Sequence, residues 1–286
     1  MTLREGQRRN VALATTWESS DPALLERIVP LVDCLEIPPD SIAASDGHRT
    51  YLRAEALDEI AGVAPRVKLA VHGIGLSMAS FDRWNEDYIR LLDEFFGRFT
   101  PEWHSEHLGY TTVAGENIGT MLPPDRTDEM LDLLCERIAR IQRRYRVPFL
   151  VENIVNLLPC DDFPYTQAGF LNAIAGCTGC GLLLDVRNIE CDARNFGFDT
   201  GAFLDELDLA PVREIHIAGG TLHEGFDLDV HSRPTADSTL ELARDVIRRA
   251  PNLETVTYEF MKEAIPALTH DGICDELRRL RAALHL

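Results

Sequence analysis

Histidine and carboxylate side chains stand near the ends of several short apolar segments of this 286-residue chain. They are His72, His107, Glu152, Asp185, His216 and Glu259, and the loop sequence DVHSRP adds Asp229 and His231. Imidazole mixed with carboxylate suits iron, manganese or zinc, and this number of donors exceeds what one ion needs. The pattern therefore predicts two or three metal ions that share bridging carboxylates and leave positions open for a substrate.

Each of these residues also has an ordinary structural explanation. A histidine in a strand is more often a hydrogen-bonded core residue than a ligand, and a carboxylate at a strand end is usually solvated or caps the next helix. Their joint occurrence favours metal, because several uncompensated carboxylates in one enclosed space suffer desolvation and repulsion that bound cations remove. Thiolate-rich sites are disfavoured since no cysteine stands at a strand end, and magnesium alone is disfavoured since imidazole is a poor ligand for it.

Other histidines and one glutamate are interpreted as structural or solvated. His104 and Glu106 lie three and one positions before His107, so in a strand both face away from it, toward the helix layer. His223 lies in the loop GGTLHEG and is interpreted as solvated. The remaining histidines fall in loop or helix contexts and are expected to be exposed: His48, His270 and His285.

The seven cysteines are scattered from Cys34 to Cys274 and do not form the dense, even framework of a secreted disulfide scaffold. We therefore expect reduced thiols. Cys177 and Cys180 form a CxxC pair, but a zinc ribbon would require a second such pair. A structural turn that enters the apolar run GLLLD is favoured over redox or metal chemistry.

Eight strand-like segments alternate with helical patterns and must position the candidate ligands. They cover residues 11–17, 32–37, 67–73, 102–108, 148–153, 181–186, 212–219 and 255–260, with long connections after the fourth and the seventh. Their continuous apolar character favours a parallel sheet covered by helices, and a single (β/α)8 TIM barrel over residues 1–286 is the simplest closure. An open doubly wound sheet is disfavoured because no glycine-rich phosphate loop follows the first strand. The carboxyl ends of barrel strands meet at one mouth, which would bring the candidate ligands together.

The charge balance limits the partners of the protein. The 28 Lys and Arg residues against 47 Asp and Glu residues give a formal charge of −19, which repels nucleic acids and anionic membranes and favours basic or neutral partner surfaces. No stretch approaches the roughly 18 apolar residues of a membrane span, and the start MTLREGQRRN lacks the apolar core of a secretory signal. We therefore expect a cytoplasmic protein.

Seven sequence motifs carry a resemblance to a known family. They are HGIGLS (72–77), SEHLGY (105–110), LVENIVNLLP (150–159), GCGLLLDVRNIECDARNFGFD (179–199), IHIAGG (215–220), DVHSRP (229–234) and YEF (258–260). In order and spacing they resemble the multinuclear non-heme iron-dependent oxidase family, which includes the methanobactin biosynthetic oxidase. The resemblance covers roughly residues 65–262, and the run LLLDVRNIECDARNFGFD is highly specific.

The resemblance implies a TIM barrel that holds two or three irons, Fe(II) or Fe(III), with O2 as co-substrate. It implies modification of a residue, commonly cysteine, in a ribosomally made precursor peptide, and a small leader-binding partner protein that forms a heterodimer with the enzyme. Carried over residue by residue, the implied iron ligands are His72, His107, Glu152, Asp185, His216, Asp229, His231 and Glu259, with Asn188 near or on a metal.

This sequence departs from the family pattern at several places. ATTWESS and EIPPDSIA stand where the family has a glycine-leucine-arginine start and an acidic-asparagine motif. Gly220 stands where the family usually has a histidine, and Arg187 replaces a common asparagine. These positions surround the substrate mouth, so the peptide and the product, whether a heterocycle or the result of carbon excision, stay open.

Two other classes of function compete with this interpretation. A divalent-metal barrel of the xylose-isomerase-like type, either a sugar isomerase or a phosphodiesterase, would use similar ligands. A phosphodiesterase acting on DNA would require a basic rim, and a sugar isomerase would require a lysine near the metals, whereas Lys68 and Lys262 lie off the strand ends. A non-catalytic barrel that binds a peptide is disfavoured because such a site is costly to maintain without metal.

Overall fold

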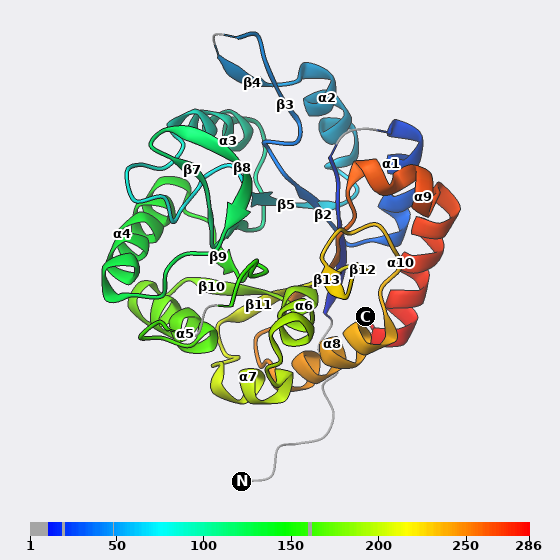
Figure 1. Ribbon diagram of the computed structural model, residues 1–286. Helices are drawn as coiled ribbons and strands as arrows, with labels where there is room; N and C mark the ends of the chain where they lie inside the picture. Colours follow the sequence, from blue (N-terminus) through cyan, green and yellow to red (C-terminus); the bar gives the residue numbers. More distant parts are fainter. Residues whose placement is uncertain (1–10, 19–20, 48, 160–161) are drawn as a thin grey trace.

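The computed structural model describes residues 11–18, 21–47, 49–159 and 162–286, and its centre is a closed barrel of eight parallel strands (Figure 1). The barrel strands are β1 (Ala12–Thr16), β2 (Cys34–Ile37), β5 (Lys68–Gly73), β6 (His104–His107), β9 (Phe149–Glu152), β10 (Gly181–Asp185), β11 (Val212–Ile217) and β14 (Thr255–Tyr258). Around the barrel they run β1, β14, β11, β10, β9, β6, β5, β2. Each lies within one predicted segment, so the predicted (β/α)8 barrel is confirmed. The expectations for His48 and for MTLREGQRRN fall outside the described residues.

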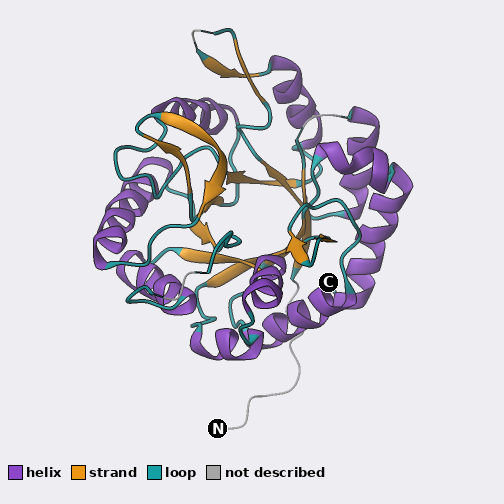
Figure 2. Cartoon of the chain, viewed as in Figure 1, coloured by secondary structure: helices purple, strands orange, loops and turns teal. Residues whose placement is uncertain are grey.

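Helices cover the outside of the barrel (Figure 2). They are α1 (Pro22–Ile28) with the 3-10 turn η1 (Val29–Leu31), α2 (Ala54–Val63), α3 (Glu86–Arg98), α4 (Asp128–Tyr145), α5 (Gln167–Thr178), α6 (Val186–Phe196), α7 (Thr200–Glu206) and α8 (Asp237–Arg249). After β14 follow η2 (Lys262–Ala264), α9 (Ile265–Leu268) and α10 (His270–Leu284). None of the described helices is long and apolar enough to cross a lipid bilayer.

Three antiparallel hairpins follow the carboxyl ends of barrel strands; two of them border the mouth, and the third projects outward beyond the helix layer (Figure 1). Two of them fill the long connections after the fourth and seventh strands: β7 (Tyr110–Val113) with β8 (Glu116–Leu122), and β12 (Thr221–His223) with β13 (Phe226–Leu228). A third, β3 (Ala43–Ser45) with β4 (Thr50–Leu52), follows β2 and is not indicated by the sequence patterns. The described hairpins thus belong to the face on which parallel strands end.

Small and apolar side chains fill the barrel interior below the mouth. Ala14, Cys34, Ala70, Trp103, Leu150 and Leu183 form a buried cluster separate from the main core between strands and helices. The indole nitrogen of Trp103 donates to Glu214 at 2.6 Å, and Thr257 donates to the other oxygen of the same carboxylate. These side chains fill the barrel between its amino end and the mouth.

The expectation of reduced thiols is wrong for one pair of cysteines. Cys135 on α4 and Cys177 on α5 form a disulfide, with their Cα atoms 6.4 Å apart. The two helices are neighbours in the outer layer, and only this packing brings together residues separated by 42 positions. Cys180 is buried and free, and Gly179 before it adopts a left-handed conformation that ends α5, so the chain turns into β10 at residues 179–180, within the CxxC segment.

Candidate metal centre

Strand pairing brings the predicted ligands side by side at the carboxyl end of the barrel. His107 on β6 is in register with Glu152 on β9, and Asp185 on β10 is in register with His216 on β11. Both pairs lie on adjacent strands at or near the last residue. Because parallel strands end on one face, residues far apart in the sequence meet inside the mouth.

The first group of potential donors consists of His72, His107 and Glu152. The Oε2 atom of Glu152 lies 3.1 Å from Nε2 of His72 and 3.3 Å from Nε2 of His107. The Nδ1–H of His107 donates to the carbonyl oxygen of Gly73 at 2.9 Å, which fixes the tautomer that leaves Nε2 free. A backbone partner of this kind is typical of metal-binding histidines, whose second nitrogen is held by a neighbour.

The second and third groups continue along the mouth. Glu152, Asp185, His216 and Glu259 offer donor atoms within 4.8 Å of one another, and so do Asp185, Asp229 and His231. The Nδ1 atom of His216 lies 3.1 Å from Oε2 of Glu259. Glu152 belongs to the first and second groups, and Asp185 belongs to the second and third. The shared carboxylates stand where bridging ligands between neighbouring ions would stand.

Unpartnered buried atoms test whether these residues fit metal ions. Six of the nine predicted ligands have a buried side-chain atom without a hydrogen bond: His72 Nε2, Glu152 Oε2, Asp185 Oδ2, Asn188 Oδ1, Asp229 Oδ1 and His231 Nδ1. Such atoms are rare in folded proteins, because each costs about 1–3 kcal/mol of lost solvation. All six can donate an electron pair to a cation, so the donor set fits metal ions.

The pKa values of these groups reflect the negative field of the clustered carboxylates. Burial on its own would lower the pKa of His72, but the carboxylates of Glu36 and Glu152 raise it to about 10. The pKa of His231 is likewise raised to about 10 against its burial, by Asp229 and Glu259. Burial and the nearby carboxylates of Asp229 and Glu152 raise the pKa of Asp185 well above its usual range. Protons and metal ions therefore compete for the same atoms.

Asn188 is positioned by the start of α6. Asp185 caps this helix, because its Oδ1 accepts a hydrogen bond from the backbone N–H of Asn188 at 2.8 Å. The side-chain amide of Asn188 donates to the carbonyl oxygen of Asn153 at 3.2 Å, which leaves its Oδ1 without a partner. Asn153 also exchanges two hydrogen bonds with the backbone of Asp185. The strand end and the helix start are thus locked together.

Glu36 on β2 is a site residue that the sequence patterns do not single out. It is fully buried, and its Oε2 lies 3.2 Å from Nε2 of His216, on the opposite side of the ring from Glu259. Glu36 also shares a group of potential donors with His72 and His216. Below it, burial and the neighbouring Glu36 raise the pKa of Glu214 to about 8. A glutamate inside the fully buried strand CLEI was the available signal.

The residues interpreted as structural lie outside the donor groups. His104 and Glu106 are buried together 2.7 Å apart, and the ring of His104 packs against Phe96 and Tyr145 in the helix layer. His223 and His285 are exposed, whereas His270 is half-buried and pairs with Asp21.

The two departures at positions 187 and 220 form one structural feature. Both terminal nitrogens of Arg187 bond to the carboxylate of Asp227 on β13. A Cβ atom added to Gly220 would lie 2.1 Å from Nη2 of Arg187, so this guanidinium occupies the space of a side chain at position 220. Arg187 thereby ties α6 to the strand that leads into Asp229.

Exposed large hydrophobic side chains gather on the same face of the barrel. Within the described residues they are Ile74, Phe81, Val113, Leu157, Leu158, Leu222 and Met261, and each lies in a segment that follows the carboxyl end of a barrel strand. Apolar surface concentrated around a mouth is typical of a face that contacts another chain or a ligand.

Solved structures with a similar fold have other functions or none stated. A xylose isomerase domain containing protein from Salmonella typhimurium LT2 superimposes with a TM-score of 0.64 at 12% identity, over 98% of this chain and 100% of that one. The IolI protein, solved with a zinc atom, gives a TM-score of 0.61 at 15% identity, over 96% of this chain and 98% of that one. At these identities the likeness shows the barrel fold alone.

Relatives in sequence are closer. A UPF0276 protein of Caulobacter vibrioides is 32% identical over 220 residues, which are 77% of this chain and 76% of that protein. A UPF0276 protein of Rhizorhabdus wittichii is 34% identical over 224 residues, 78% of this chain and 79% of that protein. The family of RiPP precursor modification enzymes MbnB/TglH/ChrH matches residues 18–285, where RiPP denotes a ribosomally synthesised and post-translationally modified peptide. This chain therefore belongs to the MbnB/TglH/ChrH family of RiPP precursor modification enzymes.

Proposed function

We propose that this protein is a multinuclear non-heme iron enzyme that uses O2 to modify a cysteine of a ribosomally made precursor peptide. The observation that carries the proposal is the set of three overlapping donor groups built from the predicted ligands alone, in which Glu152 and Asp185 are shared and six donor atoms are buried without partners. Membership of a family that acts on RiPP precursors supports the substrate class.

Each donor group would hold one ion. His72, His107 and Glu152 would hold the first; Glu152, Asp185, His216 and Glu259 the second; Asp185, Asp229 and His231 the third, with Asn188 beside it. Bound iron would supply the Lewis acidity that lets a thiol bind as thiolate near neutral pH, and the redox chemistry that O2 requires. The chain itself orients His107 through Gly73 and His216 through Glu36.

A small leader-binding partner protein is part of the proposal. The exposed hydrophobic side chains around the mouth offer a contact surface for it or for the peptide. The net charge of −19 favours a partner with basic or neutral surfaces.

A sugar isomerase is the alternative that the fold alone would allow. Such an enzyme would need a lysine near its metals, and the two lysines of this chain pair with carboxylates outside the donor groups. Lys68 is exposed and pairs with Glu102, and Lys262 lies on the rim, 3.7 Å from Glu18.

The proposal is tested by reconstituting the protein anaerobically with Fe(II) and then adding O2 and a cysteine-bearing precursor peptide encoded next to the gene for this protein. We expect two or three irons per chain, visible absorption after oxidation, O2 consumption, and a mass change of the peptide. His72→Ala and Asp229→Ala should abolish these signals with the circular dichroism spectrum unchanged, whereas the exposed control His223→Ala should keep them. Stoichiometric zinc in the purified protein, with no O2 consumption after iron loading, would overturn the proposal.

A further inference from the structure

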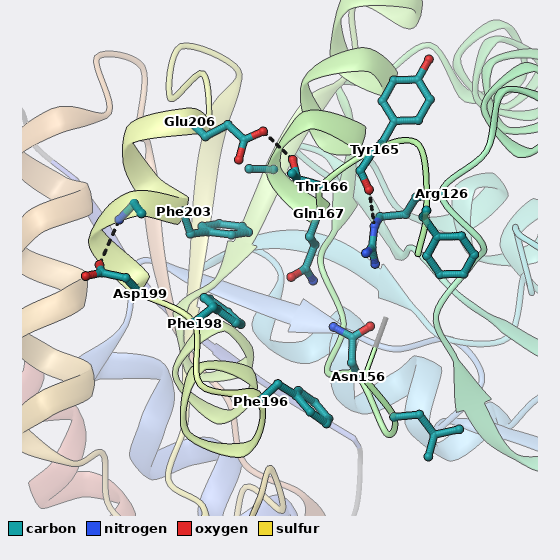
Figure 3. A pocket seen from close by; sticks show the side chains of 14 residues that line it. Arg126, Asn156, Tyr165, Thr166, Gln167, Phe196, Phe198, Asp199, Phe203 and Glu206 are labelled. Atoms are coloured by element: carbon teal, nitrogen blue, oxygen red, sulfur yellow. Dashed lines mark hydrogen bonds between the residues drawn. The ribbon is translucent and has the colours of Figure 1, made fainter. Parts of the chain in front are cut away.

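A cavity of about 350 Å³ opens at the rim of the barrel, outside the three donor groups (Figure 3). It lies between α5 and α7, and its walls come from the segment after β9 and the junction between α6 and α7. Five of the 14 lining residues are aromatic: Phe163, Tyr165, Phe196, Phe198 and Phe203. An aromatic lining of this kind favours a ligand that is flat and largely apolar.

One wall also holds a polar atom that lacks a partner. Asn156 is only 7% exposed, and its side-chain amide nitrogen donates to Asp192 at 2.5 Å. The backbone N–H of Asn156 donates to the other oxygen of Asp192 at 2.8 Å, so the orientation of the side chain is fixed. Its Oδ1 is buried with no hydrogen bond. An unused acceptor beside an aromatic cavity points to a ligand that brings an N–H or O–H donor, which a peptide supplies from the backbone beside an aromatic side chain.

The cavity is connected to the candidate metal centre through the chain. Asn156 lies four residues after Glu152, and Phe196 ends the helix that Asp185 caps. Helix α6 has 11 residues, so its two ends are about 16 Å apart at 1.5 Å per residue. An extended peptide advances about 3.3 Å per residue and covers this distance with about five residues.

We propose that the cavity binds one aromatic side chain of the precursor peptide, four to six residues away from the residue that is modified. This inference rests on the proposed function, because it assumes that a peptide residue reaches the metal centre. The volume suits one aromatic side chain and is at the low end of the range for ligand pockets. Leu157 and Leu158, exposed in the segment that forms one wall, extend the apolar surface next to the cavity. Asp199 and Glu206 in its lining disfavour an acidic neighbour of the aromatic residue.

A series of fluorescein-labelled peptides tests the spacing. Each peptide carries one cysteine and one phenylalanine separated by one to eight glycine and serine residues, and an alanine replaces the phenylalanine in the reference series. We measure fluorescence anisotropy with anaerobic, iron-loaded protein and then O2 consumption. Affinity and kcat/KM should exceed the alanine reference by about tenfold at spacings of four to six, which is what burial of one aromatic side chain supplies.

Two variants change the cavity in opposite ways. Ala202→Trp fills it from α7, and Phe198→Ala enlarges it; both should remove the advantage of the phenylalanine peptides over the alanine peptides. Ala61→Trp places the same new side chain on an exposed position of α2, across the barrel from α7, and should change nothing (Figure 1).

The outcomes separate the two proposals. Peptide modification with a flat dependence on spacing, or with the phenylalanine advantage kept in Ala202→Trp, would overturn the cavity assignment and leave the proposed function standing. Spacing-dependent binding without O2 consumption or modification would overturn the proposed function and keep the cavity as a peptide site. Equal binding of the phenylalanine peptides at every spacing would identify a site for free aromatic ligands and overturn the inference.

Discussion

Replacement of Asp185 by asparagine should change the stability of the metal-free and the metal-loaded protein in opposite directions. Asparagine caps a helix as well as aspartate does, so the hydrogen bond from the N–H of Asn188 is kept. The new amide can donate to Glu152 or Asp229, which belong to the same donor groups as Asp185 and have unpartnered oxygens. The variant therefore removes the charge and leaves the local structure intact.

The direction for the metal-free protein follows from the raised pKa of Asp185. Above its ordinary pKa of 3.8, the unfolded chain carries the ionised carboxylate while the folded state disfavours it, so this group destabilises the fold increasingly as pH rises. Asp185→Asn removes that penalty and should stabilise the metal-free protein at pH 7 by about 1–3 kcal/mol, the cost of a buried group without a partner.

The direction for the loaded protein is the reverse. At a free metal concentration 100 times the Kd, each ion stabilises the fold by about 2.7 kcal/mol. Asp185 belongs to two donor groups, so the variant should lose the contribution of two ions, about 5 kcal/mol, which corresponds to roughly 10 °C in Tm.

Thermal unfolding with and without Mn(II), a redox-stable ion with similar ligand preferences, measures both effects. Asp199→Asn is the matched control, because Asp199 caps α7 in the same way, with Ala202 N at 3.0 Å, and belongs to no described donor group. A metal-induced rise in Tm as large in Asp185→Asn as in the wild type would refute the bridging role. A metal-free Asp185→Asn protein that is less stable than the metal-free wild type, with Asp199→Asn unchanged, would refute the stabilisation expected from the raised pKa of Asp185.

Four further predictions concern other parts of the structure. Glu36→Ala should lower metal affinity about 10–100-fold with the fold kept, because His216 loses the carboxylate that orients it, and isothermal titration with Mn(II) measures this. Gly220→Ala should destabilise the protein by about 1–3 kcal/mol in denaturant titration, because the new Cβ collides with Arg187. Between pH 6 and 8, metal affinity should rise with pH, by up to tenfold per pH unit for each proton that metal binding releases. The reason is that His72 and His231, with a pKa of about 10, are protonated without metal; calorimetric titration in two buffers of different ionisation enthalpy counts the released protons. Reduction of the disulfide between α4 and α5 should cost about 2–4 kcal/mol of unfolding free energy, and an unchanged Tm in dithiothreitol would contradict this.

The barrel could be predicted because its eight strands are short, apolar and separated by helical patterns that end near turn residues. Chemistry-bearing residues at the ends of such strands must share one face, which is why His107 and Glu152 could be placed together from the sequence. The hairpin of β3 and β4 could not be predicted, because its two strands of three residues show no apolar alternation.

Glu36 and the disulfide were missed for different reasons. A single glutamate in a four-residue strand gives no periodic signal, and its importance depends on the ring of His216, 180 positions away. The pairing of Cys135 with Cys177 depends on how α4 and α5 pack in the outer layer. The CxxC spacing was interpreted as a turn and gave no indication of the partner of Cys177, which lies on another helix. Local spacing cannot report contacts that only tertiary packing creates.

Helix α6 connects the three parts of the mouth that the sequence leaves apart. At its start Asp185 holds the helix and offers its second oxygen to the second and third donor groups. Near its start Arg187 also ties the helix to β13, and in its middle Asp192 binds Asn156 in the cavity wall. At its end Phe196 lines the aromatic cavity. Asp185 at the start of α6 and Phe196 at its end belong to the metal centre and to the cavity, so the length of the helix sets the distance between the two sites. We expect the same length to set the spacing of the peptide residues that fill both sites.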